Sequence, residues 1–501
     1  MTAILQPGIR RYPLRELAWQ GGLPLIYLLA MYLFFPYWNL FWLVYDEGYN
    51  MLKARLVEQG YSLYAQIWND QAPLLTHLLA WLFEITGNEI IWSRRLILIF
   101  SALLLWALVQ YLRIAWGNLP ALISAVVLVL LPNFLVLSTA VLVGQPSLAF
   151  GMLSMLALAG WHRKRKRAFL ILSALSLSLS LLTKLFTVFL APIFLIGLLG
   201  AEFLRLRYLS EWRKVIKPAL IWGSSLGAIT LGLGLLMIRP ADVLQLFQPH
   251  ISAALSSDYP ANVELNSINY YLRPAWPMLL GALFSVLFVW RERRWLMLYP
   301  LAWMIVAYLA LLVFQPVWWH HQVLVTIPAA MLAGGAFGES LGLFFKKVRK
   351  PGEQRKLWLI IISNLIIMGL TFATLLPIAV DYLHSAQKVN ADGRDPAQER
   401  FMKRIEVYAP QTKWMVTDEP MFAFRAGISV PPNLAVISWK RFAAGDLTED
   451  EILQTLRQLR PEQVFFGRFD LPKVNQYLAE NYRETLHWEE MNLYVRNDLQ
   501  K

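Results

Sequence analysis

Long apolar segments separated by short polar connections occupy the chain from about residue 22 to residue 379. Each of eleven segments is long enough, at roughly 20 residues, to cross the hydrocarbon core of a bilayer. They lie at 22–43, 91–112, 119–137, 144–161, 168–183, 186–204, 218–238, 274–290, 296–314, 321–345 and 357–379. This pattern predicts a polytopic α-helical membrane protein with about eleven transmembrane helices.

The pattern changes after residue 383, where charged and mixed sequence replaces the apolar runs. Strand-like runs alternate with helical ones: strands at 414–417, 434–438, 464–466, 484–488 and 492–496, helices at 448–459 and 471–481. Such alternation favours an α/β fold with a mainly parallel sheet. We therefore divide the chain into a transmembrane region, 1–383, and a soluble α/β domain, 384–501.

The composition agrees with a membrane protein. The 501 residues are 57% hydrophobic and only 16% charged, with a mean hydropathy of +0.45. So few charged residues could not cover the surface of a soluble protein of this size. The chain has no cysteine, which excludes thiol catalysis, thiolate metal sites and disulfide bonds.

The net charge of +13 is distributed unevenly over the connections between the apolar runs. If the N-terminus is cytoplasmic, the inner connections hold 23 Lys and Arg and the outer ones hold 7. Cytoplasmic loops carry the excess of positive charge, so this orientation is favoured. It predicts a multi-pass plasma-membrane protein with a retained cytoplasmic leader, 1–19, and an extracytoplasmic C-terminal domain. The basic run 163–167 is then a topology signal rather than a nucleic-acid site.

The outer connection from 44 to 90 contains two predicted helices. Residues 48–59 have the apolar spacing of an interfacial amphipathic helix, and Gly60 is placed to end it. A second surface helix starts after Pro73 and ends at Gly87, because its apolar run is too short to cross the bilayer.

Two adjacent carboxylates, Asp46 and Glu47, stand at the start of this connection. They can act as helix-capping acids, since a helix N-terminus favours negative charge. They can also supply a general base or a metal ligand at the outer surface. The two interpretations are compatible, because the helix that is capped also orients its carboxylate.

The order of motifs in this region resembles the first outer loop of the GT-C glycosyltransferases. It is similar to the branch of family 39 that contains the protein O-mannosyltransferases and the lipid A aminoarabinose transferases. The motifs are Asp46-Glu47-Gly48-Tyr49, Trp68-Asn69-Asp70-Gln71-Ala72-Pro73-Leu74-Leu75, Arg95-Leu96, Leu182-Thr183-Lys184 and Gln315-Pro316-Val317-Trp318-Trp319-His320-His321. Two positions depart from the family pattern. Ala72-Pro73 replaces the usual proline doublet, and Gln145 stands where an acidic residue is often found.

The resemblance implies transfer of a sugar from a polyprenyl-phosphate carrier to an acceptor on the outer face. By position, Asp46 resembles the catalytic carboxylate of the acidic pair. That carboxylate is expected to take the proton from the acceptor nucleophile as the configuration of the sugar inverts. Glu47 would then support it or position the acceptor. The sequence does not decide which sugar is moved, whether the acceptor is a protein, lipid or glycan, or whether a divalent metal takes part.

Three further residues are candidates for binding the donor phosphate: Lys184, Arg95 and His321. Each also has a plain alternative. Lys184 can snorkel from a helix end, Arg94 or Arg95 can pair with Glu84 or Glu89, and the histidines can belong to an interfacial aromatic belt.

Residues Asp70, Tyr49, His320 and His250 are candidates for acceptor binding or loop positioning. His320 and His321 point to different faces of a helix, so they are poorly placed to bind one metal ion together. The loop that carries His250, with its polar tail 256–258, is expected to form a lid over the site. Asp418-Glu419 follows a predicted strand, where helix capping is the simpler role and the domain would shape acceptor access.

A rival hypothesis is a transporter or flippase of lipid-linked saccharides. Such proteins place polar groups near the middle of broken membrane helices. Here the notable polar residues, Asp46, Lys184, His250 and His320-His321, gather on one face instead. A non-catalytic lipid-binding scaffold is a second rival.

Overall fold

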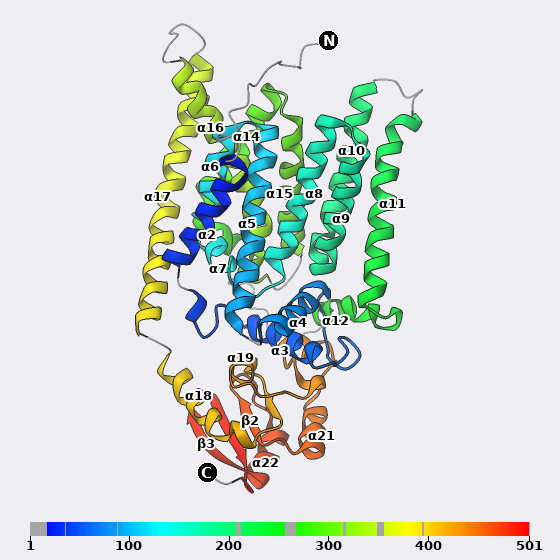
Figure 1. The fold of residues 1–501 in the computed structure, drawn as a ribbon. Helices are drawn as coiled ribbons and strands as arrows, with labels where there is room; N and C mark the ends of the chain where they lie inside the picture. Colours follow the sequence, from blue (N-terminus) through cyan, green and yellow to red (C-terminus); the bar gives the residue numbers. More distant parts are fainter. Residues whose placement is uncertain are drawn as a thin grey trace.

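The computed structural model describes residues 18–35, 37–87, 89–206, 212–255, 267–313, 317–347, 355–392 and 395–499. A helix bundle forms the larger part, and a small mixed domain is attached at one end of it (Figure 1). The bundle contains α2 (Leu23–Phe34), α5 (Ile90–Ala115), α6 (Asn118–Val129), α7 (Pro132–Leu137), α8 (Gly144–Lys164), α9 (Arg167–Thr183), α10 (Leu190–Leu206), α11 (Trp212–Met237), α14 (Trp276–Arg291), α15 (Leu298–Val313), α16 (Val323–Lys347) and α17 (Arg355–Asp392). Each of the eleven predicted apolar runs therefore contains a helix.

By length and composition, seven helical segments in the described ranges are apolar enough to cross a membrane: Ile90–Ala115, Leu185–Arg205, Trp212–Met237, Ile268–Arg291, Trp295–Val313, Trp319–Phe345 and Leu357–Val389. Four more are apolar but shorter: Leu23–Phe34, Leu74–Thr86, Asn118–Val129 and Arg167–Thr183. The prediction of a polytopic α-helical membrane protein is confirmed.

The first helix is shorter than predicted. The apolar run 22–43 forms a helix only as far as Phe34, and Phe35 leaves the helical conformation with φ −118° and ψ 81°. Residue 36 is a proline, and the residue before a proline disfavours the helical region. Asp46 and Glu47 thus follow a connecting segment rather than the first helix directly.

Close packing at glycine holds the centre of the bundle together. A Cβ at Gly334 of α16 would lie 2.3 Å from the Cα of Ser124, and one at Gly338 would lie 2.5 Å from the Cα of Pro120. Small residues four positions apart let two helix backbones approach each other, the usual device of membrane helices. The pair α6 and α16 therefore forms a fixed scaffold.

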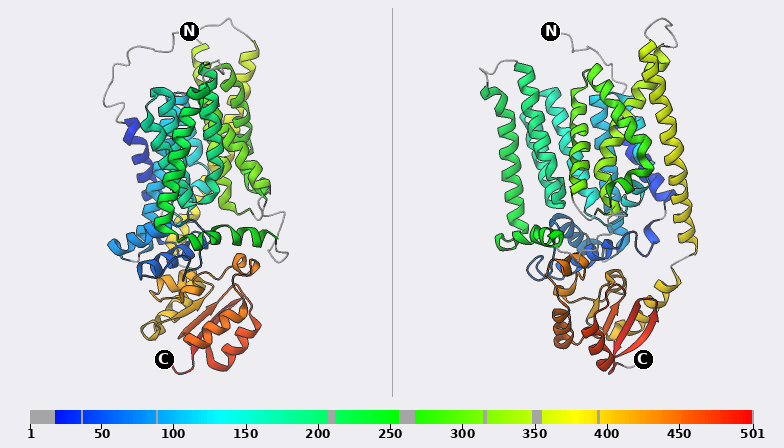
Figure 2. Two further views of the ribbon diagram at one scale, coloured as in Figure 1. Left: turned by 90° about the vertical axis from the view of Figure 1, so that its right-hand side faces the viewer. Right: turned by 180° about the vertical axis from the view of Figure 1, so that it is seen from behind.

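Three helices lie across the end of the bundle, between it and the C-terminal domain (Figures 1 and 2). These are α3 (Asp46–Glu58), α4 (Leu74–Thr86) and α12 (Gln248–Leu255). The first two match their predictions, and Gly60 and Gly87 follow them with φ of +93° and +76°. However, α3 is not a surface helix. Its residues from Glu47 to Leu56 are all buried, because the C-terminal domain covers the side turned away from the bundle.

The C-terminal domain is a four-stranded sheet with helices, reached through α17, which continues past the predicted boundary at 383. Its elements are α18 (Pro396–Tyr408), β1 (Met415–Thr417), α19 (Pro420–Arg425), α20 (Trp439–Ala443), α21 (Glu449–Leu459), β2 (Gln463–Phe466), α22 (Pro472–Asn481), β3 (Tyr482–Trp488) and β4 (Met491–Arg496).

Two expectations about this sheet are wrong. Its order is β1-β2-β4-β3, and only the β1–β2 pair is parallel, since the hairpin β3–β4 joins antiparallel to β2. The run 434–438 is not a strand either. Residues 434–437 are buried but do not pair with the sheet. The prediction failed because a short apolar run indicates burial and does not show whether the segment has a strand to pair with.

Candidate functional site

Asp46 and Glu47, the two carboxylates in the first turn of α3, point in different directions. Successive residues of a helix are about 100° apart around its axis. Glu47 is fully buried and pairs with Arg94, whose Nε and Nη2 donate to Oε1 and Oε2 at 3.0 and 2.7 Å. The backbone N–H groups of Leu43 and Val141 also donate to it, at 3.0 and 3.2 Å. All of its hydrogen-bonding capacity is thus used inside the protein.

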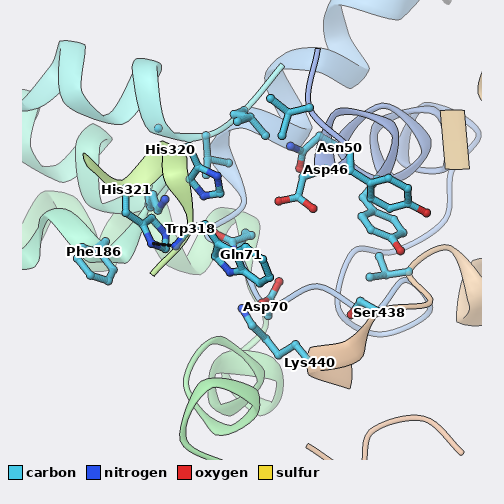
Figure 3. Close-up of a pocket in the computed structure, with 18 of the residues that line it drawn as sticks. Asp46, Asn50, Asp70, Gln71, Phe186, Trp318, His320, His321, Ser438 and Lys440 are labelled. Atoms are coloured by element: carbon cyan, nitrogen blue, oxygen red, sulfur yellow. Dashed lines mark hydrogen bonds and ion pairs between the residues drawn. The ribbon is translucent and has the colours of Figure 1, made fainter. Parts of the chain in front are cut away.

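Asp46 faces a cavity of about 800 Å³ instead (Figure 3). Its carboxylate makes no hydrogen bond or ion pair with any residue of the described ranges. The side chain is exposed, because the cavity is partly open to solvent. Desolvation by the surrounding protein raises the pKa of Asp46, and the positive charge of Lys440 opposes that rise. The result is an available carboxylate that holds a proton more readily than an isolated aspartate does.

The bundle end, the crossing helices and the C-terminal domain together line this cavity. Seven of the residues predicted from sequence lie in its wall: Asp46, Tyr49, Asp70, Lys184, His250, His320 and His321. Residues up to 275 positions apart in the chain, from Asp46 to His321, are therefore brought to one place. The tail of the predicted lid, 256–258, lies outside the described residues.

Lys184 caps the C-terminal end of α9 in an extended conformation. Its Nζ makes no hydrogen bond or ion pair with the part of the chain that the structure describes. Burial and the neighbouring Lys440 lower the pKa of Lys184 to about 8, although Asp46 and Asp70 act in the opposite direction. The ammonium is still charged at neutral pH and available for an anion.

Asp70 joins three separate elements. Lys440 of α20 donates to its Oδ2 at 2.8 Å, and His250 of α12 lies 3.1 Å from its backbone oxygen. Lys440 Nζ is also 3.4 Å from His250 Nδ1. Burial of Asp70 raises its pKa, but the positive charges of Lys440, His250 and Lys53 outweigh this effect and hold the pKa well below its ordinary value. Asp70 is therefore a charged anchor rather than a proton acceptor.

The two histidines lie in the short helix Trp319–Gln322. His321 accepts the Trp318 N–H at 3.2 Å and stacks on Phe186, with ring centroids 5.7 Å apart. The two imidazole rings are nearly perpendicular, at 74°. In the described ranges no group of three or more His, Cys, Asp or Glu is arranged to hold a metal ion.

Two predicted site residues are not in the cavity wall. One is Glu47, as described above. The other is Arg95, whose guanidinium lies 4.5 Å from the ring centre of Trp92, on the outside of α5. The expected pairing of this arginine pair with Glu84 or Glu89 is wrong for Arg94, which binds Glu47 and three backbone carbonyls of residues 37–40.

Sequence reasoning missed several residues of the wall. Lys53 is one turn beyond Asn50 and two beyond Asp46, so these residues share one face of α3, and the spacing could have revealed Lys53. Its Nζ donates to Asn69 Oδ1 at 2.8 Å. Lys440 and Arg468 come from the C-terminal domain, and no local pattern marks them.

The C-terminal domain is joined directly to α3. Arg468 stacks 3.9 Å over the Tyr45 ring and donates to the Tyr49 hydroxyl at 3.2 Å. The Tyr45 and Tyr49 hydroxyls themselves donate to the backbone oxygens of Asp418 and Ile437. The Asp418 carboxylate accepts three backbone N–H groups of residues 467–469, so its role is to fix the loop that carries Arg468.

Two solved structures with a similar fold are informative. ArnT from Cupriavidus metallidurans bound to undecaprenyl phosphate superposes with a TM-score of 0.59 at 13% identity, covering 95% of this chain and 98% of that one. AglB from Archaeoglobus fulgidus, in complex with an inhibitory peptide and a dolichol-phosphate, gives 0.57 at 11% identity, covering 96% and 75%. The protein has the GT-C glycosyltransferase fold.

The family model for dolichyl-phosphate-mannose-protein mannosyltransferases matches residues 70–223 of the chain. The match begins at Asp70 and includes Arg95, Gln145 and Lys184. Comparison with curated proteins by sequence gives no match. The predicted resemblance to GT-C glycosyltransferases is thereby confirmed.

Proposed function

We propose that this protein transfers a sugar from a polyprenyl-phosphate-linked donor to an acceptor at the extracytoplasmic face, with Asp46 as general base. The observation that carries the proposal is the contrast between two adjacent acids. Glu47 is fully paired, whereas Asp46 has no hydrogen-bond or ion-pair partner among the described residues, faces a large cavity and has a raised pKa. A general base must be free to accept a proton, and a pKa closer to neutrality makes it more effective.

The charges of the cavity favour an anionic donor. Two carboxylates in its wall, Asp46 and Asp70, are outnumbered by the cations Lys53, Lys184, Lys440 and Arg468. Asp70 is already neutralised by Lys440. Lys184 is at the bundle side of the cavity and free of ion pairs with described residues, so we assign it to the donor phosphate.

In the proposed reaction, a hydroxyl or amine of the acceptor gives its proton to Asp46 and attacks the anomeric carbon of the sugar. The bond from that carbon to the phosphate oxygen breaks, and its electron pair leaves with the lipid phosphate. Lys184 stabilises the charge that develops on the leaving group. Attack from the side opposite the phosphate inverts the anomeric centre.

The ligands of the two structural relatives support this assignment. The ArnT structure holds undecaprenyl phosphate, and the AglB structure holds a dolichol-phosphate and an inhibitory peptide. The excess of Lys and Arg in the connections at the other end of the bundle supports an outer position of the site. The donor is then lipid-linked, because nucleotide sugars are cytoplasmic.

A radiolabelled polyprenyl-phosphate sugar tests the proposal when it is incubated with the purified protein and candidate acceptors. We expect the label to appear in an acceptor. In proteoliposomes, movement of the labelled lipid across the membrane without transfer would indicate a flippase. Retention of the label without either outcome would indicate a binding protein.

A further inference from the structure

Gln145 carries a side-chain amide that is buried but unpaired. The residue is 2% exposed, and neither Nε2 nor Oε1 has a hydrogen-bond partner among the described residues. Gln145 lines the same cavity as Asp46. A buried polar group without a partner destabilises a folded protein, so an unpaired amide in the wall of a cavity indicates a ligand site.

The start of α8 also leaves its backbone open to the cavity. Gly144 lines the cavity, and a Cβ built there would meet no atom within 4 Å. The N-cap residue, Val143, provides no side-chain cap. The first N–H groups of a helix have no intrahelical partner, so Gly144 and Gln145 offer backbone donors beside the side-chain amide.

This turn is held at a defined position relative to α3. Asn50 Nδ2 donates to the Val141 oxygen at 2.9 Å, and the Val141 N–H donates to Glu47 Oε1 at 3.2 Å. Glu47 and Asn50 belong to the helix that carries Asp46. Gln145 is thus positioned with respect to the proposed base.

The chemistry of the amide restricts its ligand. The NH₂ group donates, the carbonyl oxygen accepts, and neither is charged. A phosphate offers only acceptors to this pair, and a metal ion would leave Nε2 unpaired. Two neighbouring hydroxyls of a sugar ring satisfy both atoms, since one can accept and the other can donate.

We propose that Gln145 and the first turn of α8 form a sugar-recognition subsite that binds a free vicinal diol of the transferred sugar. The inference rests on the proposed function and deepens it. Gln145 determines which sugar is accepted, while Lys184 binds the phosphate and Asp46 activates the acceptor.

The test compares the full-length wild type with Gln145→Leu, which keeps a similar volume and removes both hydrogen-bonding groups. The probes are free polyprenyl phosphate, polyprenyl phosphates carrying mannose, glucose or galactose, and singly deoxygenated forms of the sugar that binds best. Equilibrium binding is measured in detergent, and transfer is measured in parallel.

In the wild type, we expect removal of either hydroxyl of the diol to weaken binding about tenfold. Gln145→Leu should weaken binding of the intact sugar lipid about 10- to 100-fold and no longer distinguish it from those deoxy forms. Binding of free polyprenyl phosphate should be equal in both proteins. Gln145→Glu keeps only hydrogen-bond acceptors in its side chain. Its binding of the sugar lipid should still weaken when the hydroxyl that donates a hydrogen bond is removed.

A matched control is Gln454→Leu on the exposed face of α21, which should leave every probe unaffected. The subsite would be overturned if Gln145→Leu weakened binding of the intact and the deoxy sugar lipids by the same factor. It would also be overturned if this variant weakened binding of free polyprenyl phosphate equally, or if the wild type bound no sugar lipid in preference to the others. If binding discriminates as expected but no sugar is ever transferred, the subsite stands and the proposed function fails.

Discussion

At the scale of single residues, Asp46 and Glu47 differ in what surrounds them rather than in their own chemistry. Glu47 ties α3 to Arg94 and to the segment that leads into α8. Asp46, one position earlier, has only the cavity in front of it. This difference makes their substitutions distinguishable.

Replacing Asp46 with Asn should abolish sugar transfer while the protein stays folded. The amide cannot accept the acceptor's proton, yet it fits the same space. Turnover of a radiolabelled sugar lipid and the thermal unfolding temperature in detergent measure the two effects. Near-normal turnover of this variant would contradict the role of Asp46 as base.

Replacing Glu47 with Gln should act mainly on stability. The change leaves the buried guanidinium of Arg94 without a counter-charge, and breaking a buried ion pair in this way costs about 3–5 kcal/mol. Unfolding by denaturant in detergent would measure the loss. A variant that is as stable as the wild type but inactive would show instead that Glu47 acts directly in the reaction.

The pH dependence of transfer should reflect two groups. Asp46 must be deprotonated, and desolvation by the surrounding protein raises its pKa, so activity should fall on the acid side at a higher pH than an isolated aspartate would allow. Lys184 must be protonated, and its pKa is lowered to about 8, so donor KM should rise as the pH increases through that value.

The variant Lys184→Arg separates the acid limb of the pH profile, assigned to Asp46, from the alkaline limb, assigned to Lys184. Arginine stays charged throughout the accessible range, so the rise of donor KM near pH 8 should disappear while the acid limb remains. Profiles of kcat and KM from pH 5 to about 9.5 are compared for both proteins. An alkaline limb that persists unchanged would assign it to another group.

At the scale of elements, α3 makes an extensive contact with the C-terminal domain, and Gly48 lies at a point of close approach in that contact. A Cβ at this position would lie 2.8 Å from the Met421 nitrogen and 2.9 Å from Pro420 Cγ, at the start of α19. The glycine of the Asp46-Glu47-Gly48 motif is therefore required by domain docking.

We expect Gly48→Ala to destabilise this docking by about 1–3 kcal/mol, the usual cost of overpacking. Limited proteolysis should then release the C-terminal domain faster, and transfer should decrease because Lys440 and Arg468 are displaced. Gly223→Ala in α11 is a suitable control, since a Cβ there meets nothing within 4 Å. Equal protease resistance of the Gly48 variant and the wild type would refute the docking role.

At the scale of the whole molecule, the orientation in the membrane decides which substrates reach the cavity. The chain has no cysteine, so single cysteines can be introduced without background. We expect Lys403→Cys in the C-terminal domain to react with a membrane-impermeant maleimide on intact cells, and Arg163→Cys to react only after permeabilisation. The opposite result would invert the predicted topology.

Much of the bundle could be predicted because its signals are local. The apolar runs and the stop at Gly60 each depend on a few neighbouring residues. The end of the first helix before Pro36 was not predicted, although its signal is local as well. The same local signals misplaced the run 434–438 and the order of the sheet, because strand pairing joins residues that are far apart in the chain. Arg95 was predicted to bind the donor phosphate because it belongs to the Arg-Leu motif. The structure instead buries the neighbouring Arg94, and burial of one arginine rather than the other depends on the tertiary packing.

By itself, the sequence determined the class of protein, the helices of the bundle and the bias of positive charge, since hydrophobic periodicity and loop charge are readable without contacts. It marked Asp46 as a candidate base through the resemblance of its motif to the GT-C glycosyltransferases. Only the tertiary structure decided that Asp46 is free while Glu47 is paired, and that Lys440 reaches Asp70 across 370 residues. It also showed that the side-chain amide of Gln145 has no hydrogen-bond partner in the part of the chain that the structure describes. Each of these properties depends on which distant segments pack together, and the burial and electrostatics that result exist only in the folded chain.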